Sequence, residues 1–188
     1  MIHVLIADDH AVVRRGLKQI IAEQSDMAVV GEAQNADELL RLARTLQWNV
    51  IVLDIHMPGR SGLEVLKEIK RAHPKRAVLI LSMHPEEQYA TRVLRAGAAG
   101  YLTKEAAPAE LVSAIRKVSR GGRYVSATLA ENLAMDLDKD SQKPLHANLS
   151  DRELQVMLMI VAGKSVSEIA QALALSAKTV STYRTRIV

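Results

Sequence analysis

The chain has 188 residues, of which 48% are hydrophobic and 24% are charged, a composition typical of a folded globular protein rather than a disordered one. It contains no cysteine, which excludes disulfides and thiolate metal sites, so any metal must be a hard cation with oxygen ligands. No apolar run approaches the roughly 18 residues that a membrane helix needs, and the N-terminus lacks the basic segment of an export signal. We therefore expect a cytoplasmic protein with no membrane partner.

The positive charge of the chain is weak support for any one partner. Its formal net charge is +4 and its pI is about 9.4, values that suit a polyanion such as nucleic acid. The excess of Lys and Arg is spread over residues 1–120 and residues 149–188, so charge alone does not locate a binding surface. A prediction of DNA binding therefore has to rest on sequence motifs.

Residues 1–120 alternate short apolar runs with longer amphipathic segments. This alternation is typical of βα units that build a parallel sheet with helices on both faces. The predicted strands are 2–7, 27–32, 50–53, 77–81 and 100–102. We therefore predict a doubly wound α/β domain.

The predicted helices of this domain have recognisable starts and an apolar stripe. Ser61 with Glu64 forms a capping-box pattern, Asn35 precedes two acidic residues, and Pro108 fits a first helical turn. In the first and last helices the apolar spacing is helical, which predicts that one face of each is buried. The residues on these two stripes are Val13, Leu17, Ile20, Leu111, Ala114, Ile115 and Val118.

Residues 121–148 lose this regular pattern. Gly121 and Gly122 stop the preceding helix, residues 128–137 fit a short helix, and residues 138–148 are polar with one proline. We interpret 121–148 as a linker between a first domain, 1–120, and a second domain, 149–188. The second domain has three short helical patterns and no strand pattern, so we expect it to be all-α. Its predicted helix starts are Ser150 with Glu153, Ser165 with Glu168, and Ser176.

Acidic residues follow two of the predicted strands in the first domain. Asp8 and Asp9 come after the first strand, and Asp54 comes after the third. Because the carboxyl ends of parallel strands share one edge of the sheet, these side chains should converge. Carboxylates that crowd together repel one another, and Mg²⁺ is the natural counter-ion. Lys104, after the fifth strand, would reach the same edge, and together these groups could accept a phosphoryl group. Considered alone, Asp9 fits an ordinary helix cap better than a metal ligand, and only the whole set of residues favours the metal site.

The motifs of residues 1–120 resemble the receiver domains of response regulators. They are Ile-Ala-Asp-Asp-His at 6–10, Leu-Asp-Ile-His-Met-Pro-Gly at 53–59, Leu-Ser at 81–82 and Gly-Tyr-Leu-Thr-Lys at 100–104. The resemblance implies a flavodoxin-like (βα)5 sheet with strand order 2-1-3-4-5. It also implies that a sensor histidine kinase phosphorylates Asp54 in a Mg²⁺-dependent reaction.

The same resemblance assigns roles to the other residues of these motifs. Asp8, Asp9, Asp54 and the backbone carbonyl of His56 would hold the Mg²⁺ ion. Lys104 would pair with the phosphoryl oxygens, and the Ser82 hydroxyl would turn toward them once phosphate arrives. Tyr101 would change rotamer with that movement, and residues 83–97 would shift with it.

An enzymatic alternative is a Mg²⁺-dependent phosphatase with an aspartate nucleophile, similar to the haloacid dehalogenases. Such enzymes normally carry a second acid two residues after the nucleophile, which serves as general acid and base. Here that position is His56, which argues against turnover. We therefore predict a protein that is not an enzyme, apart from its own phosphorylation and a slow self-dephosphorylation.

The second domain contains a predicted helix-turn-helix. Residues 165–173 form a helix with one apolar face, residues 174–176 form a tight turn, and a last helix starts at Ala177. On the last helix Val180, Tyr183 and Ile187 should point inward. The opposite face is polar and basic, which suits either a DNA major groove or plain solvent. Its residues are Lys178, Thr179, Ser181, Thr182, Thr185 and Arg186.

This domain resembles the LuxR-type helix-turn-helix, through Leu-Ser-Asp-Arg-Glu at 149–153, residues 163–170 and residues 175–180. Joined to a receiver, it implies a regulator of the NarL/FixJ class that binds promoter DNA and forms a homodimer when phosphorylated. Ser181, Thr182 and Thr185 would lie nearest the bases, and Lys178, Thr179 and Arg186 would contact phosphates. We expect the domain to be incomplete, because the recognition helix of 178–188 is longer in the family. The alternative is a second domain that serves protein interaction only.

Overall fold

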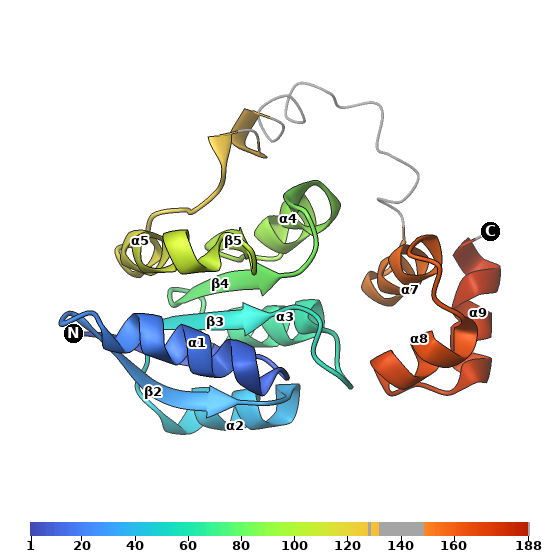
Figure 1. Cartoon of the computed structure of the whole chain (residues 1–188), viewed down its shortest axis with the longest axis horizontal. Helices are drawn as coiled ribbons and strands as arrows, with labels where there is room; N and C mark the ends of the chain where they lie inside the picture. The colour runs from blue at the N-terminus through green and yellow to red at the C-terminus, as the bar shows by residue number, and fades with distance from the viewer. Residues whose placement is uncertain (128, 132–148, 188) are drawn as a thin grey trace. The chain divides into compact units, whose positions relative to one another are not determined.

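The computed structural model describes residues 1–127, 129–131 and 149–187 (Figure 1). The chain divides into two compact units, Met1–Met135 and Asp136–Val188. Most of the predicted linker 121–148 and of the predicted short helix 128–137 lies outside the described residues. Among the helices of the described ranges, none is both long and apolar enough to cross a membrane.

A five-stranded parallel sheet forms the centre of the first unit, and its order β2-β1-β3-β4-β5 confirms the predicted fold. Every residue of β3 and β4 is buried, as expected where helices cover both faces of a parallel sheet. All five predicted strands are present, and four of them extend one residue beyond their predicted end. The strands are β1 (Ile2–Ala7), β2 (Met27–Ala33), β3 (Val50–Asp54), β4 (Ala77–Ser82) and β5 (Gly100–Thr103).

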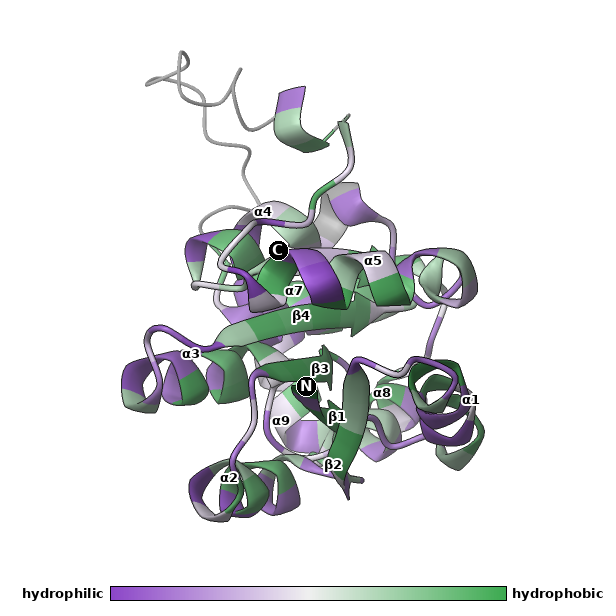
Figure 2. Cartoon of the chain, turned by 90° about the vertical axis from the view of Figure 1, so that its left-hand side faces the viewer, coloured by the Kyte–Doolittle hydropathy of each residue, from purple (hydrophilic) through white to green (hydrophobic). Residues whose placement is uncertain are grey.

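Helices cover both faces of this sheet. Their bounds are α1 (Ala11–Ala22), α2 (Ala36–Thr45), α3 (Gly62–Ala72), α4 (Glu86–Arg95) and α5 (Ala107–Ser119). Figure 2 shows α1 and α5 on one side of the sheet and α2, α3 and α4 on the other, with apolar strands between them. On α5 the predicted stripe is fully buried, and on α1 Leu17 is buried while Val13 and Ile20 pack at the margin of the core.

All three predicted helix starts are confirmed, but one of them lacks the predicted capping hydrogen bond. The Asn35 side chain accepts a hydrogen bond from the Glu38 amide at 2.9 Å, and Pro108 lies in the first turn of α5. Ser61 precedes α3 but makes no capping hydrogen bond, and its side chain is buried. The first turn of α3 packs directly on the β3–α3 loop, where a Cβ on Gly62 would lie 2.5 Å from the Ile55 Cα. Tertiary packing has thus replaced the local cap.

The chain after α5 returns to the edge of the sheet, which the sequence analysis did not anticipate. Gly121, with φ +85°, lies in the turn that follows α5. Tyr124 then forms an isolated parallel bridge with Gly100. The Tyr124 amide donates to the Ala99 carbonyl at 2.9 Å, and the Tyr101 amide donates to the Tyr124 carbonyl at 3.1 Å. A Cβ at position 100 would lie 2.5 Å from the Tyr124 oxygen, so this approach requires glycine.

The second unit contains three helices, α7 (Asp151–Val161), α8 (Val166–Leu173) and α9 (Ala177–Ile187). Both predicted capping boxes are present, at Ser150 with Glu153 and at Ser165 with Glu168, and the Ser176 hydroxyl accepts from the Thr179 amide at 3.0 Å. Ala174 adopts a left-handed conformation (φ 52°) and makes the turn between α8 and α9. The small core consists of Val156, Ile169, Ala170, Leu173 and Val180.

Candidate functional site

The predicted acidic residues meet at the carboxyl edge of the sheet. Asp8 follows β1 and Asp54 ends β3, and these strands are paired with Ala7 opposite Leu53. Asp8 and Asp54 are buried, with 0% and 1% of their surface exposed, whereas Asp9 is partly exposed. Oxygens of these three carboxylates and a ring nitrogen of His10 all lie within 4.8 Å of one another. The donor set and its spacing fit a divalent cation.

Lys104 bridges the two buried carboxylates. Its Nζ lies 2.7 Å from the Asp8 Oδ2 and 2.7 Å from the Asp54 Oδ2, and its side chain is only 8% exposed. Burial lowers the pKa of Lys104, but Asp54 and Asp8 outweigh burial and hold this pKa above its ordinary value. Lys104 is therefore a fixed positive charge beside the Asp54 carboxylate.

Three effects, one of which opposes the other two, act on the pKa of the Asp54 carboxyl. Burial raises its pKa, the nearby Lys104 charge lowers it, and the negative charge of Asp8 raises it again, with a raised pKa as the net result. The amide of His56 donates to the Asp54 Oδ1 at 2.9 Å, so one oxygen faces the backbone and the other faces Lys104. These two contacts hold the carboxylate in one orientation. Its raised pKa indicates that the positive charge of Lys104 does not fully offset its burial and the charge of Asp8.

The predicted switch residues form a connected set beside Asp54. Ser82 ends β4, is fully buried, and its hydroxyl accepts a hydrogen bond from the His84 amide at 3.0 Å. The Ser82 carbonyl accepts from the Lys104 amide at 2.7 Å. Tyr101 is also fully buried, and its hydroxyl donates to the His84 carbonyl at 2.8 Å. His84, which the sequence analysis did not single out, therefore joins the two predicted switch residues.

Comparisons with known proteins match both units. A model of the response regulator receiver domain matches residues 4–116, and a model of the bacterial regulatory proteins of the luxR family matches residues 147–188. Response regulator UvrY of Escherichia coli (strain K12) is 42% identical over this whole chain and 86% of its own length. Response regulator GacA of Pseudomonas viridiflava is 44% identical over this whole chain and 88% of its own length.

The chain is a response regulator. A solved structure with a similar fold is RcsB from Salmonella enterica serovar Typhimurium, bound to a promoter in the presence of the phosphomimetic BeF3⁻. It is 28% identical with a TM-score of 0.66, over 99% of this chain and 89% of RcsB. A receiver joined to a LuxR-type domain confirms the predicted NarL/FixJ class and the prediction of a transcription regulator rather than a phosphatase.

In the LuxR-type domain of this response regulator, the predicted DNA-facing residues lie along α9. All of them are exposed except Thr179, which is half-buried with its Oγ1 2.8 Å from the Ser176 Oγ. Val180 points into the core as predicted, with Tyr183 and Ile187 packed beside it. Arg186 lies 3.9 Å from the Glu153 carboxylate of α7, so its guanidinium also has a partner within the domain.

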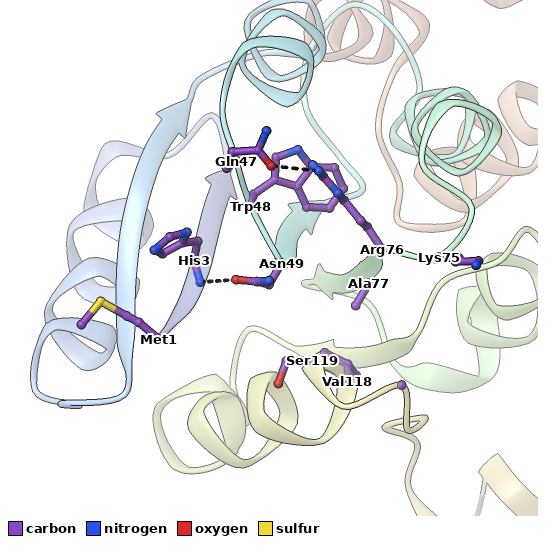
Figure 3. A pocket seen from close by; sticks show the side chains of 11 residues that line it. Met1, His3, Gln47, Trp48, Asn49, Lys75, Arg76, Ala77, Val118 and Ser119 are labelled. Atoms are coloured by element: carbon purple, nitrogen blue, oxygen red, sulfur yellow. Dashed lines mark hydrogen bonds between the residues drawn. The ribbon is translucent and has the colours of Figure 1, made fainter.

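A hollow of about 430 Å³ lies at the opposite, amino-terminal edge of the receiver sheet (Figure 3). Arg76 lines one side of it, donates to the Gln47 side chain at 3.2 Å and stacks 4.8 Å from the centre of the Trp48 ring. The carboxylates of Asp8 and Asp54 lie at the other edge of the sheet. The hollow is therefore separate from the acidic cluster.

Proposed function

We propose that Asp54 accepts a phosphoryl group from a sensor histidine kinase, at a Mg²⁺ site that Asp8, Asp9, Asp54 and the His56 carbonyl would form. The observation that carries this proposal is Lys104, whose Nζ lies 2.7 Å from both Asp8 and Asp54. A lysine between two buried carboxylates can transfer one of its contacts to an incoming phosphoryl group without leaving the cluster. When bound, Mg²⁺ would neutralise charge on the phosphoryl oxygens and polarise the phosphorus.

The His56 amide and Lys104 position the nucleophile, which is the Asp54 carboxylate, and Lys104 then binds the phosphoryl group. An Asp54 oxygen attacks phosphorus as the bond from phosphorus to the kinase histidine breaks, and the result is an aspartyl phosphate. The His56 amide and Lys104 hold the two Asp54 oxygens before attack. Lys104 then exchanges its contact with Asp54 for the phosphoryl oxygens, where added charge of about −1.5 to −2 attracts it.

The same added charge would operate the switch. The Ser82 hydroxyl accepts from the His84 amide before phosphorylation and would turn to donate to a phosphoryl oxygen afterwards. This movement releases the His84 amide and disturbs the Tyr101 hydrogen bond to the His84 carbonyl. The start of α4 follows directly after His84, so the face of the receiver around α4 changes.

The output of this switch is binding of promoter DNA by α9, in the cytoplasm and as a phosphorylation-dependent homodimer. Ser181, Thr182 and Thr185 present exposed hydroxyl side chains on one face, and Lys178 supplies positive charge there. The support for this assignment is the match of residues 147–188 to the luxR family and the likeness to RcsB, which was solved on a promoter. The alternative of an interaction domain without DNA has no comparable support.

The test of the phosphorylation site is the intact mass of the protein after incubation with acetyl phosphate. Wild type should gain one phosphoryl group with Mg²⁺ and none with EDTA, and Asp54→Asn should gain none. Asp26→Asn is the matched control, because Asp26 pairs with Arg116 on the surface and should leave labelling unchanged. Normal labelling of Asp54→Asn would disprove the assignment.

A further inference from the structure

His10 lies at the rim of the acidic cluster and was not assigned a role by the sequence motifs. Its Nδ1 is 2.8 Å from the Asp9 Oδ1 and 3.2 Å from the Asp8 Oδ1. The ring is 62% exposed, so it can approach an ion from the solvent side of the cluster. A neutral imidazole offers a nitrogen donor among the carboxylate oxygens.

The backbone holds this ring near the carboxylates. His10 is the residue that precedes α1, and its amide donates to the Asp8 Oδ1 at 2.8 Å. Arg14, one turn further along α1, donates to the Asp8 carbonyl at 2.7 Å. The position of the His10 backbone relative to Asp8 is therefore fixed, and a ring nitrogen already lies among the carboxylate oxygens.

The spacing of these donors matches adjacent positions of an octahedral metal site. Ligands about 2.1 Å from an ion in octahedral geometry lie about 3 Å apart when they are neighbours. The two distances from the His10 Nδ1 to the Asp9 and Asp8 oxygens are 2.8 and 3.2 Å. Oxygen donors suit Mg²⁺ and Mn²⁺ alike, whereas an imidazole nitrogen favours transition metal ions over Mg²⁺.

We propose that His10 is a nitrogen ligand for a divalent transition ion, Mn²⁺ in particular, at the site of Asp8, Asp9 and Asp54. The site then binds Mn²⁺ more tightly than Mg²⁺, because His10 contributes a bond to Mn²⁺ and little to Mg²⁺. This inference rests on the proposed metal site and adds a residue and a metal preference to it. The competing explanation is that His10 only hydrogen-bonds to the carboxylates and does not bind the ion.

Pulsed electron paramagnetic resonance of the Mn²⁺-loaded full chain tests the inference directly. Wild type should show a ¹⁴N coupling from a coordinated imidazole, and His10→Gln should lose it. Mn²⁺ titration should show about a tenfold weaker Kd for His10→Gln, while the Kd for Mg²⁺ by competition should change less than about twofold. His3→Gln is the matched control, because His3 lies near the opposite end of β1 and should keep both the coupling and the Kd.

The outcomes separate this inference from the proposed function. Mn²⁺ binding without a ¹⁴N coupling, or with equal Kd in wild type and His10→Gln, overturns the role of His10 and leaves the carboxylate site intact. An equal loss of Mg²⁺ and Mn²⁺ affinity in His10→Gln also overturns it, since it would mean a general electrostatic effect. Failure of wild type to bind Mn²⁺ overturns it as well, and labelling of Asp54 by acetyl phosphate with Mg²⁺ then decides the phosphorylation proposal separately.

Discussion

At the scale of single residues, the acidic cluster is a balance of opposing charges. Asp54 and Asp8 are both buried and both contact Lys104, which gives two negative charges and one fixed positive charge in a site with little solvent. The raised pKa of Asp54, caused first by burial and then by Asp8 against the opposing charge of Lys104, shows that compensation is incomplete. Such incomplete compensation lowers the stability of the metal-free fold.

Asp54→Asn should therefore stabilise the metal-free receiver. A folded-state pKa above the unfolded value means that the ionised carboxylate costs stability, and this cost grows as the pH rises above the unfolded value. Lys104 keeps Asp8 as a partner in the variant, so no buried charge is left alone. Urea unfolding in EDTA at pH 7 should show a gain of about 1 kcal/mol in the free energy of unfolding.

Addition of Mg²⁺ supplies the control for this measurement. An ion that binds only the folded state stabilises it by mass action, so wild type should gain stability with Mg²⁺ and Asp54→Asn should gain less. A free energy of unfolding that is lower for Asp54→Asn than for wild type in EDTA would contradict the electrostatic account.

At the scale of secondary structure elements, helix starts that depend on near neighbours were predictable. Ser150 with Glu153 and Ser165 with Glu168 each close a capping box across three residues in the sequence. The same pattern at Ser61 and Glu64 gives no cap, because the β3–α3 loop packs against the start of α3. A local pattern is therefore reliable only where the surrounding fold leaves the helix end in solvent.

The two capping boxes should make the stability of the second unit dependent on pH. Hydrogen bonds from Ser150 lower the pKa of Glu153, and hydrogen bonds from Ser165 lower the pKa of Glu168, below the ordinary value of 4.5. Their stabilisation is present above this unfolded value and is lost as pH falls below it through the folded-state pKa. We expect melting curves of the full chain, followed by circular dichroism from pH 6 to 3.5, to show this loss.

The double variant Glu153→Gln and Glu168→Gln isolates the contribution of the caps. Glutamine can keep the capping hydrogen bonds but does not titrate in this range. The Tm of the helical second unit should fall less with acidification in the double variant than in wild type. Identical pH dependence in the two proteins would show that the capping glutamates do not contribute.

At the scale of the whole molecule, two units with separate cores share one chain. The receiver unit includes residues beyond α5, since Tyr124 pairs with β5 and the buried Leu129 belongs to the same unit. Ser126 also hydrogen-bonds to Glu86, the first residue of α4. The segment that leads toward the second unit thus contacts the part of the receiver that follows Ser82 and His84. The domain limits of 1–120 and 149–188 remain a prediction.

The salt dependence of DNA affinity tests whether α9 binds DNA. If Lys178 contacts a phosphate, Lys178→Ala should weaken binding to a random-sequence duplex and reduce the slope of log K against log salt by about 0.9. Lys75→Ala is the charge-matched control, because Lys75 is exposed on the receiver. Fluorescence anisotropy from 50 to 200 mM salt gives both slopes. Equal slopes for the two variants would remove Lys178 from the DNA surface.

The α/β class, the five strands and the meeting of Asp8, Asp9 and Asp54 at one sheet edge could all be predicted from the order of the residues. This is possible because strand and helix periodicity, and most capping bonds, depend on residues within a few positions. Three contacts became visible only in the folded protein: Lys104 with both Asp8 and Asp54, the His10 ring with the acids, and Tyr124 with β5. These contacts, the His10 ring excepted, join residues far apart in the chain, and each depends on the packing of several elements at once.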